Sequence, residues 1–91
     1  MSYNVETMPL ADEDLQKLPR PISNIILRRF LAFARNPGNG ESRPAPSTYP
    51  PGQLLELAFP VDDMFCFAGI VFKYGADEQT LVIERIFVEF Q

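Results

Sequence analysis

The sequence predicts an α+β fold, with an N-terminal strand and a two-helix hairpin packed on a mostly antiparallel sheet of about four strands. Two observations predict it. The stretch from Pro9 to Pro37 has the pattern of two short amphipathic helices, separated by Leu18-Pro19-Arg20-Pro21. All the continuous apolar sequence rich in Val, Ile and Phe lies downstream. Because the helices must bury their apolar faces and the sheet is the only large surface available, the hairpin is expected to lie on the sheet.

Length, charge and composition narrow the class of protein. The chain has 91 residues, 46% of them hydrophobic, which favours a single domain over residues 1–91 with a small core of its own. Its formal net charge of -4 should repel nucleic acid, so any such contact must be local. Histidine is absent and Cys66 is the single cysteine, which argues against triads, multi-cysteine metal sites and internal disulfides. We expect neither cofactor nor metal.

No apolar run approaches the length that spans a bilayer, and the N-terminus lacks the basic and apolar regions of a signal peptide. We therefore expect a cytoplasmic protein.

The first elements follow from their residue periods. Residues 3–7 alternate in the period-two pattern of a short strand. From Pro9 onward, Ala11, Leu15 and Leu18 recur at helical spacing, which predicts a first helix of about two turns.

A second, longer helix is predicted to begin near Pro21, whose fixed φ suits a first helical position. Ile22, Ile26 and Phe30 belong to its broad apolar face. The stop signal Asn36-Pro37-Gly38 ends it.

The remainder divides into a loop and three strands. Residues 36–52 are rich in proline and glycine, and loops of this length in small domains are either functional or disordered. We expect this one to be disordered, and either to cover a site or to link the helical and β halves. Turn residues at Asp62-Asp63 and at 75–78 then separate three strands. The expected strands are Leu54–Phe59, Phe65–Tyr74 and Leu81–Phe90.

An ordered series of short motifs spans residues 3–37: Val5-Glu6, Pro9-Leu10-Ala11, Asp14-Leu15, Lys17-Leu18-Pro19, Pro21-Ile22, Ile26-Leu27, and Leu31 through Asn36-Pro37. This series resembles the opening of the RelE/ParE family, the toxins of bacterial toxin-antitoxin systems. Later, Val71-Phe72-Lys73-Tyr74 and Leu81 through Ile86 resemble the family's final hairpin. The resemblance implies a short strand, a helical hairpin with a Leu-Pro step, and a terminal sheet.

The resemblance also implies candidate chemistry. Members of the RelE branch cut messenger RNA in the ribosome with clustered Lys and Arg. Here such a cluster would combine Arg43 on the loop with Lys73 and Arg85 on the last two strands. Tyr49 or Tyr74 would stack on a base or share a proton.

The catalytic pattern is weak in this sequence. Lys73 and Arg85 are the only basic residues of the last two strands. Glu84 and Glu89 add negative charge where developing phosphate charge would need neutralisation. The ParE branch instead binds DNA gyrase, and a toxin-like protein that has lost activity is a third possibility.

Partner binding has a separate argument. The strand predicted at Leu81–Phe90 carries apolar residues on both sides, whereas a strand covered on one face should alternate. We therefore expect a homodimer or a complex with an antitoxin. The preferred interpretation is a toxin-like component of a toxin-antitoxin system, such as those of plasmid stabilization, acting by protein binding. The alternatives are a ribosome-dependent mRNA endonuclease and an orphan interaction domain.

Overall fold

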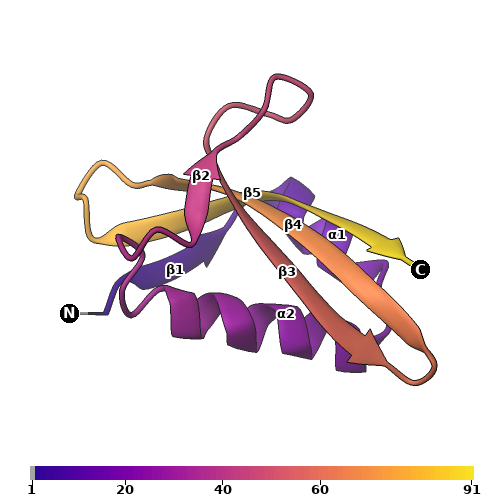
Figure 1. The fold of residues 1–91 in the computed structure, drawn as a ribbon. Helices are drawn as coiled ribbons and strands as arrows, with labels where there is room; N and C mark the ends of the chain where they lie inside the picture. The colour runs from indigo at the N-terminus through magenta and orange to yellow at the C-terminus, as the bar shows by residue number, and fades with distance from the viewer. Residues whose placement is uncertain (1) are drawn as a thin grey trace.

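A mixed sheet with two helices on one face makes up the part of the chain that the computed structural model describes, residues 2–91 (Figure 1). This arrangement confirms the predicted α+β class. The elements in chain order are β1 (Asn4–Thr7), α1 (Pro9–Gln16), α2 (Arg20–Phe33), β2 (Ser42–Pro44), β3 (Gln53–Val61), β4 (Met64–Tyr74) and β5 (Thr80–Phe90).

The helical hairpin is divided where the prolines predict. Helix α1 begins at Pro9 and ends at Gln16, and Pro19 is the N-cap of α2. Proline suits these first positions because they require no N–H for an intrahelical bond. Helix α2 ends at Phe33, three residues before the predicted stop signal that begins at Asn36, and turn residues follow the helix. Neither helix among the described residues is long and apolar enough to cross a membrane.

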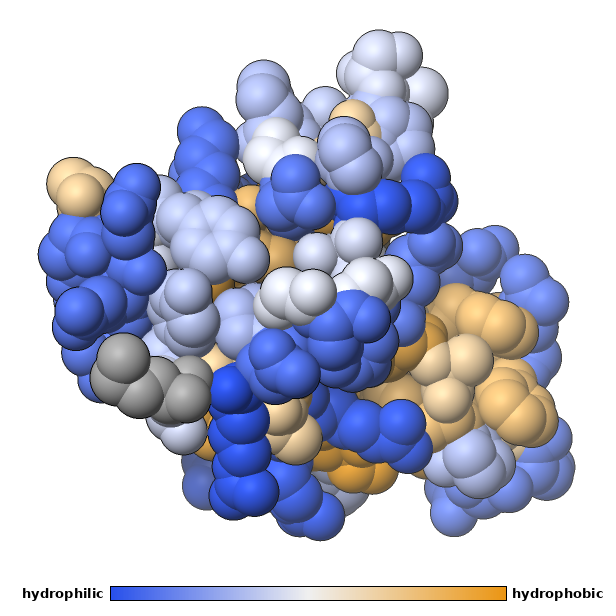
Figure 2. All heavy atoms as spheres, turned by 60° about the vertical axis from the view of Figure 1, so that its left-hand side comes forward, coloured by the Kyte–Doolittle hydropathy of each residue, from blue (hydrophilic) through white to orange (hydrophobic). Residues whose placement is uncertain are grey.

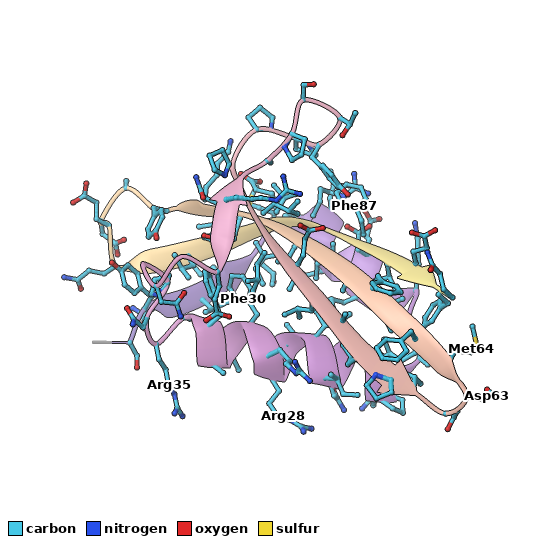
Figure 3. The ribbon with its side chains drawn as sticks, in the orientation of Figure 1. Arg28, Phe30, Arg35, Asp63, Met64 and Phe87 are labelled. Carbon is cyan, nitrogen blue, oxygen red and sulfur yellow. The ribbon has the colours of Figure 1, made fainter. Side chains whose placement is uncertain are left out.

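The core lies between α2 and the sheet. The rings of Phe30, Phe33 and Phe72 pack together, with centroids 5.3 to 5.5 Å apart. Phe30 and Phe72 are fully buried, and Phe30 points from α2 toward the sheet in Figure 3. Arg28 and Arg35 point away from the sheet in the same view, so α2 has the two-sided character that its sequence predicts. Cys66 is buried in the same core, and burial raises the pKa of its thiol.

The strand order is β1-β5-β4-β3-β2. Strand β1 runs parallel to β5, and the other neighbours are antiparallel. The predicted turn at Asp62-Asp63 is a two-residue connection between β3 and β4, and Asp62 has a φ of 54°. Asp tolerates this left-handed conformation better than most residues, which explains its presence there.

The sheet has five strands, and the prediction of about four missed β2. Strand β2 lies inside the segment expected to be a loop, where Arg43 pairs with Leu54 and Pro44 with Gln53. Its three residues are too few for a periodic pattern, and proline is accepted because β2 is an edge strand. The Pro/Gly-rich segment therefore extends the sheet.

The two-sided apolar pattern of β5 results from a β-bulge. Val71 pairs with Arg85 and Phe72 with Ile83, so Glu84 is an extra residue without a partner on β4. Leu81 and Ile83 before the bulge, and Ile86 and Val88 after it, all join the helix-side core. The inference that the second flank of this strand needs a partner was therefore wrong for Ile86 and Val88. The bulge moves them to the side that the helices cover.

We expect Gly52→Ala to destabilise the fold by about 1–3 kcal/mol. Gly52 has a φ of 147°, and a Cβ atom there would lie 2.8 Å from the carbonyl oxygen of Phe72. Gly38→Ala is the matched control, since no heavy atom lies within 4 Å of its Cβ position. Urea denaturation of both variants measures the difference. Equal stabilities would contradict the close approach of the loop to β4.

Candidate functional site

The candidate site is the sheet face opposite the helices, here called the outer face. On β4, Cys66, Ala68, Ile70 and Phe72 belong to the helix-side core. Because side chains alternate along a strand, the intervening Phe67, Gly69, Val71 and Lys73 belong to the outer face. Val71 and its partner Leu54 are buried without joining the helix-side core. The outer face thus has a small buried centre of its own.

Arg43 and Lys73 lie on the outer face, and each forms an ion pair. The Arg43 guanidinium donates two hydrogen bonds to Glu56 Oε1, from Nη2 at 2.9 Å and from Nε at 3.2 Å. Lys73 Nζ lies 3.4 Å from Glu84 Oε1. Arg43 and Lys73 both have side chains about half exposed, so these pairs contribute little to stability. They do neutralise both cations locally.

Arg85 is held more firmly, at the junction of β5 and α1. Its Nε and Nη2 atoms donate to the two carboxylate oxygens of Asp14, at 2.8 and 3.1 Å. The N–H of Ile86 donates to the same carboxylate at 2.9 Å. Burial raises the pKa of the Asp14 carboxyl, but these hydrogen bonds outweigh burial and leave the pKa below its usual value. The pair correspondingly raises the pKa of Arg85.

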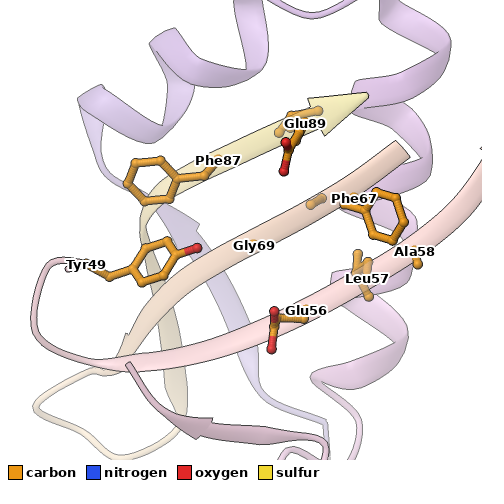
Figure 4. Close-up of a pocket in the computed structure, with 10 residues that line it drawn as sticks. Tyr49, Glu56, Leu57, Ala58, Phe67, Gly69, Phe87 and Glu89 are labelled. Atoms are coloured by element: carbon orange, nitrogen blue, oxygen red, sulfur yellow. The ribbon is translucent and has the colours of Figure 1, made fainter. Parts of the chain in front are cut away.

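The two candidate tyrosines lie on different faces. Tyr74 packs edge to face against Tyr3, at 5.8 Å between centroids, and also contacts Phe72 of the core. It is therefore on the helix side, away from its neighbour Lys73. Tyr49 extends from the loop between β2 and β3 onto the outer face, where its ring lies 5.2 Å from that of Phe87 (Figure 4). The structure thus places Tyr49, and not Tyr74, on the face that carries Arg43, Lys73 and Arg85.

A cavity of about 300 Å³ opens on the outer face beside Tyr49 (Figure 4). Phe87 and Tyr49 line one side, Phe67 lines another, and Gly69 lies between them at the floor. Glu56 and Glu89 flank the cavity on the neighbouring strands. The sequence did not indicate this group, because Phe67 shares its side of the strand with the apolar Phe65 and Val71, and the face of Phe87 depends on the bulge in β5.

Hydrophobic side chains are also exposed near the end of the β3–β4 hairpin. Met64, Phe65 and Phe67 are 40 to 48% exposed, and Phe90 at the end of β5 is 39% exposed. Figure 2 shows a gathering of hydrophobic residues on the right of the surface, bordered by hydrophilic ones. Within residues 2–91, no group of three or more His, Cys, Asp or Glu side chains is arranged to hold a metal ion.

Comparison with known proteins supports the predicted fold. No protein-family model and no curated protein matches the sequence. Among solved structures, the chain is similar to a chain of the RelBE2 toxin-antitoxin complex from Mycobacterium tuberculosis, with a TM-score of 0.63 and 20% sequence identity. The similarity covers 98% of this chain and 100% of that chain. The protein therefore has a RelE-like fold, as the motif series predicts.

Asp14→Asn should destabilise the protein by about 1–3 kcal/mol at neutral pH, because the neutral amide holds Arg85 and the Ile86 N–H less strongly. The folded pKa of Asp14 lies below its ordinary value of 3.8. Its stabilising contribution is therefore fully present above that value and is lost as the pH falls through the folded pKa.

Denaturant unfolding between pH 7 and pH 2 tests this. Asp14→Asn should lower stability at neutral pH and reduce the loss of stability on acidification. Asp63→Asn is the control, since Asp63 is exposed in the hairpin turn. A pH profile of Asp14→Asn identical to that of the unsubstituted protein would contradict the stabilising role of the ionised Asp14 carboxylate.

Proposed function

We propose that this chain is the toxin-like component of a bacterial toxin-antitoxin system and that it acts by binding another protein, with an antitoxin as its principal partner. The fold supports the first part, since a chain of a toxin-antitoxin complex shares it along its whole length. The outer face supports the second.

The observation that supports this proposal most is that each candidate catalytic cation is already paired with a carboxylate. Arg43 pairs with Glu56, Lys73 with Glu84, and Arg85 with Asp14. Cleavage of RNA requires free positive charge where charge develops on the phosphate. Glu89 adds a further exposed carboxylate to the same face. The electrostatics therefore favour a protein partner over a phosphodiester.

The exposed hydrophobic residues suit such a partner. Exposed apolar patches rimmed by polar residues are typical of protein–protein interfaces, and aromatic side chains and Met are enriched in them. Phe65 and Met64 lie at the hairpin end, and their side chains are 48% and 45% exposed.

The ribosome-dependent endonuclease remains the second candidate, because one observation favours it. Arg43, Lys73 and Arg85 lie on one face together with Tyr49, which is the kind of clustering that cleavage would need. Displacement of Glu56 and Glu84 by an incoming phosphate would be required to free two of the cations.

Expression of the chain from an inducible promoter in a bacterial host should arrest growth, and co-expression of the small protein encoded beside it should relieve the arrest. Phe65→Glu should weaken the complex of the two proteins roughly tenfold or more, because it places a charge in the apolar contact. Leu31→Glu is the matched control, since Leu31 is 55% exposed on α2. Calorimetry with the purified pair measures both affinities. Growth without arrest, or equal effects of the two substitutions, would contradict the proposal.

Incubation of the purified protein with ribosomes and a reporter message should give no cleavage products. The double variant Arg43→Ala with Lys73→Ala changes two exposed side chains and should leave the fold intact. Cleavage by the unsubstituted protein that falls at least about a hundredfold in this variant would replace the protein-binding proposal with the endonuclease.

A further inference from the structure

The cavity on the outer face combines aromatic walls with carboxylates. Gly69 pairs with Phe87 of β5 and with Glu56 of β3, and two residues earlier Phe67 pairs with Glu89. The register therefore places two rings and two carboxylates around a residue without a side chain. Tyr49 closes one end, and its side chain extends from the loop toward the strands that carry Phe87 and Gly69 in Figure 4.

The local charge of this cavity is negative. Glu89 forms no ion pair within residues 2–91. Glu56 pairs with Arg43, and both side chains are more than half exposed, so an incoming cation competes with a weak interaction. The charge of Arg85, the other nearby cation, is balanced by Asp14.

The rings are also suited to a cation. The negative face of an aromatic ring attracts ammonium and guanidinium groups. The Arg85 guanidinium carbon already lies 5.2 Å from the Phe87 ring centroid, within the range of this interaction. A second cation on the cavity side would meet Tyr49 and Phe67 together with the two carboxylates.

We propose that this cavity binds a basic side chain, a guanidinium or ammonium group, presented by a segment of a partner protein. The proposal rests on the protein-binding function and names the chemistry of the partner. That segment carries apolar residues beside the basic one, because Phe65 and Phe67 are exposed on the same face, and Phe67 lines the cavity. A phosphate is repelled by Glu56 and Glu89. A second copy of this chain docked face to face would bring the same carboxylates together, which disfavours a symmetric dimer through this surface.

Titration of the isotope-labelled full chain with Nα-acetyl-arginine amide, followed by NMR, tests the cavity. The amide signals of Phe67, Gly69, Phe87 and Glu89 should shift. Nα-acetyl-citrulline amide has the same shape without the charge and should bind at least about threefold more weakly. Glu89→Gln should weaken arginine binding about threefold to fivefold. Tyr49→Leu should weaken it similarly, because the aromatic face is lost while an apolar side chain remains.

Glu6→Gln is the matched control, since Glu6 pairs with Val82 at the far end of β5 and makes the same change of charge. It should leave binding unchanged. Equal binding of arginine and citrulline, shifts confined to other residues, or equal effects of Glu6→Gln and Glu89→Gln would overturn the proposal. Shifts of the cavity amides by uridine 3′-monophosphate in place of arginine would overturn it in favour of nucleic acid. If arginine does not bind but co-expression of the neighbouring protein still relieves growth arrest, only the cavity assignment is wrong. If arginine binds but expression of the chain does not arrest growth, the toxin proposal is wrong.

Discussion

The bulge in β5, which Asp14 stabilises, determines which side chains of this strand face the helices and which face outward. Strand β1 pairs with β5 only as far as Ile83, and α1 then follows along the same edge. Asp14 of α1 accepts the Ile86 N–H that a neighbouring strand would otherwise take, and it binds Arg85 with the same carboxylate. The Asp14 side chain thus accepts a hydrogen bond from a backbone N–H at the strand edge and holds α1 against β5. It also stabilises the point where the extra residue Glu84 is inserted.

The bulge also determines what each face contains. Before it, the odd-numbered residues Leu81 and Ile83 enter the helix-side core, and after it the even-numbered Ile86 and Val88 do. Phe87 and Glu89 are thereby assigned to the outer face, next to Gly69 and Phe67. Without the extra residue, Phe87 would face the helices and the cavity would lose one of its walls.

The outer face joins two properties that matter for function. Its basic residues are paired with acidic ones from neighbouring elements, so the clustering of Arg43, Lys73 and Arg85 does not produce a strong positive field. Its aromatic residues, in contrast, are free to contact another molecule, as the exposure of Phe67 shows. This combination is the physical reason to prefer recognition of a protein segment over cleavage of a nucleic acid on a RelE-like fold.

The sequence by itself determined the helical hairpin, the three long strands and the turn at Asp62-Asp63, because helical period, alternation and proline geometry are local properties. The family resemblance suggested a basic cluster of Arg43, Lys73 and Arg85, and the register of the strands places the three residues on the outer face. Only the tertiary structure decided that β2 extends the sheet, that a bulge at Glu84 reverses the faces of β5, and that Asp14, distant in sequence, captures Arg85. These features depend on pairing between segments far apart in the chain, and the period of one strand carries no information about the register that its neighbour imposes.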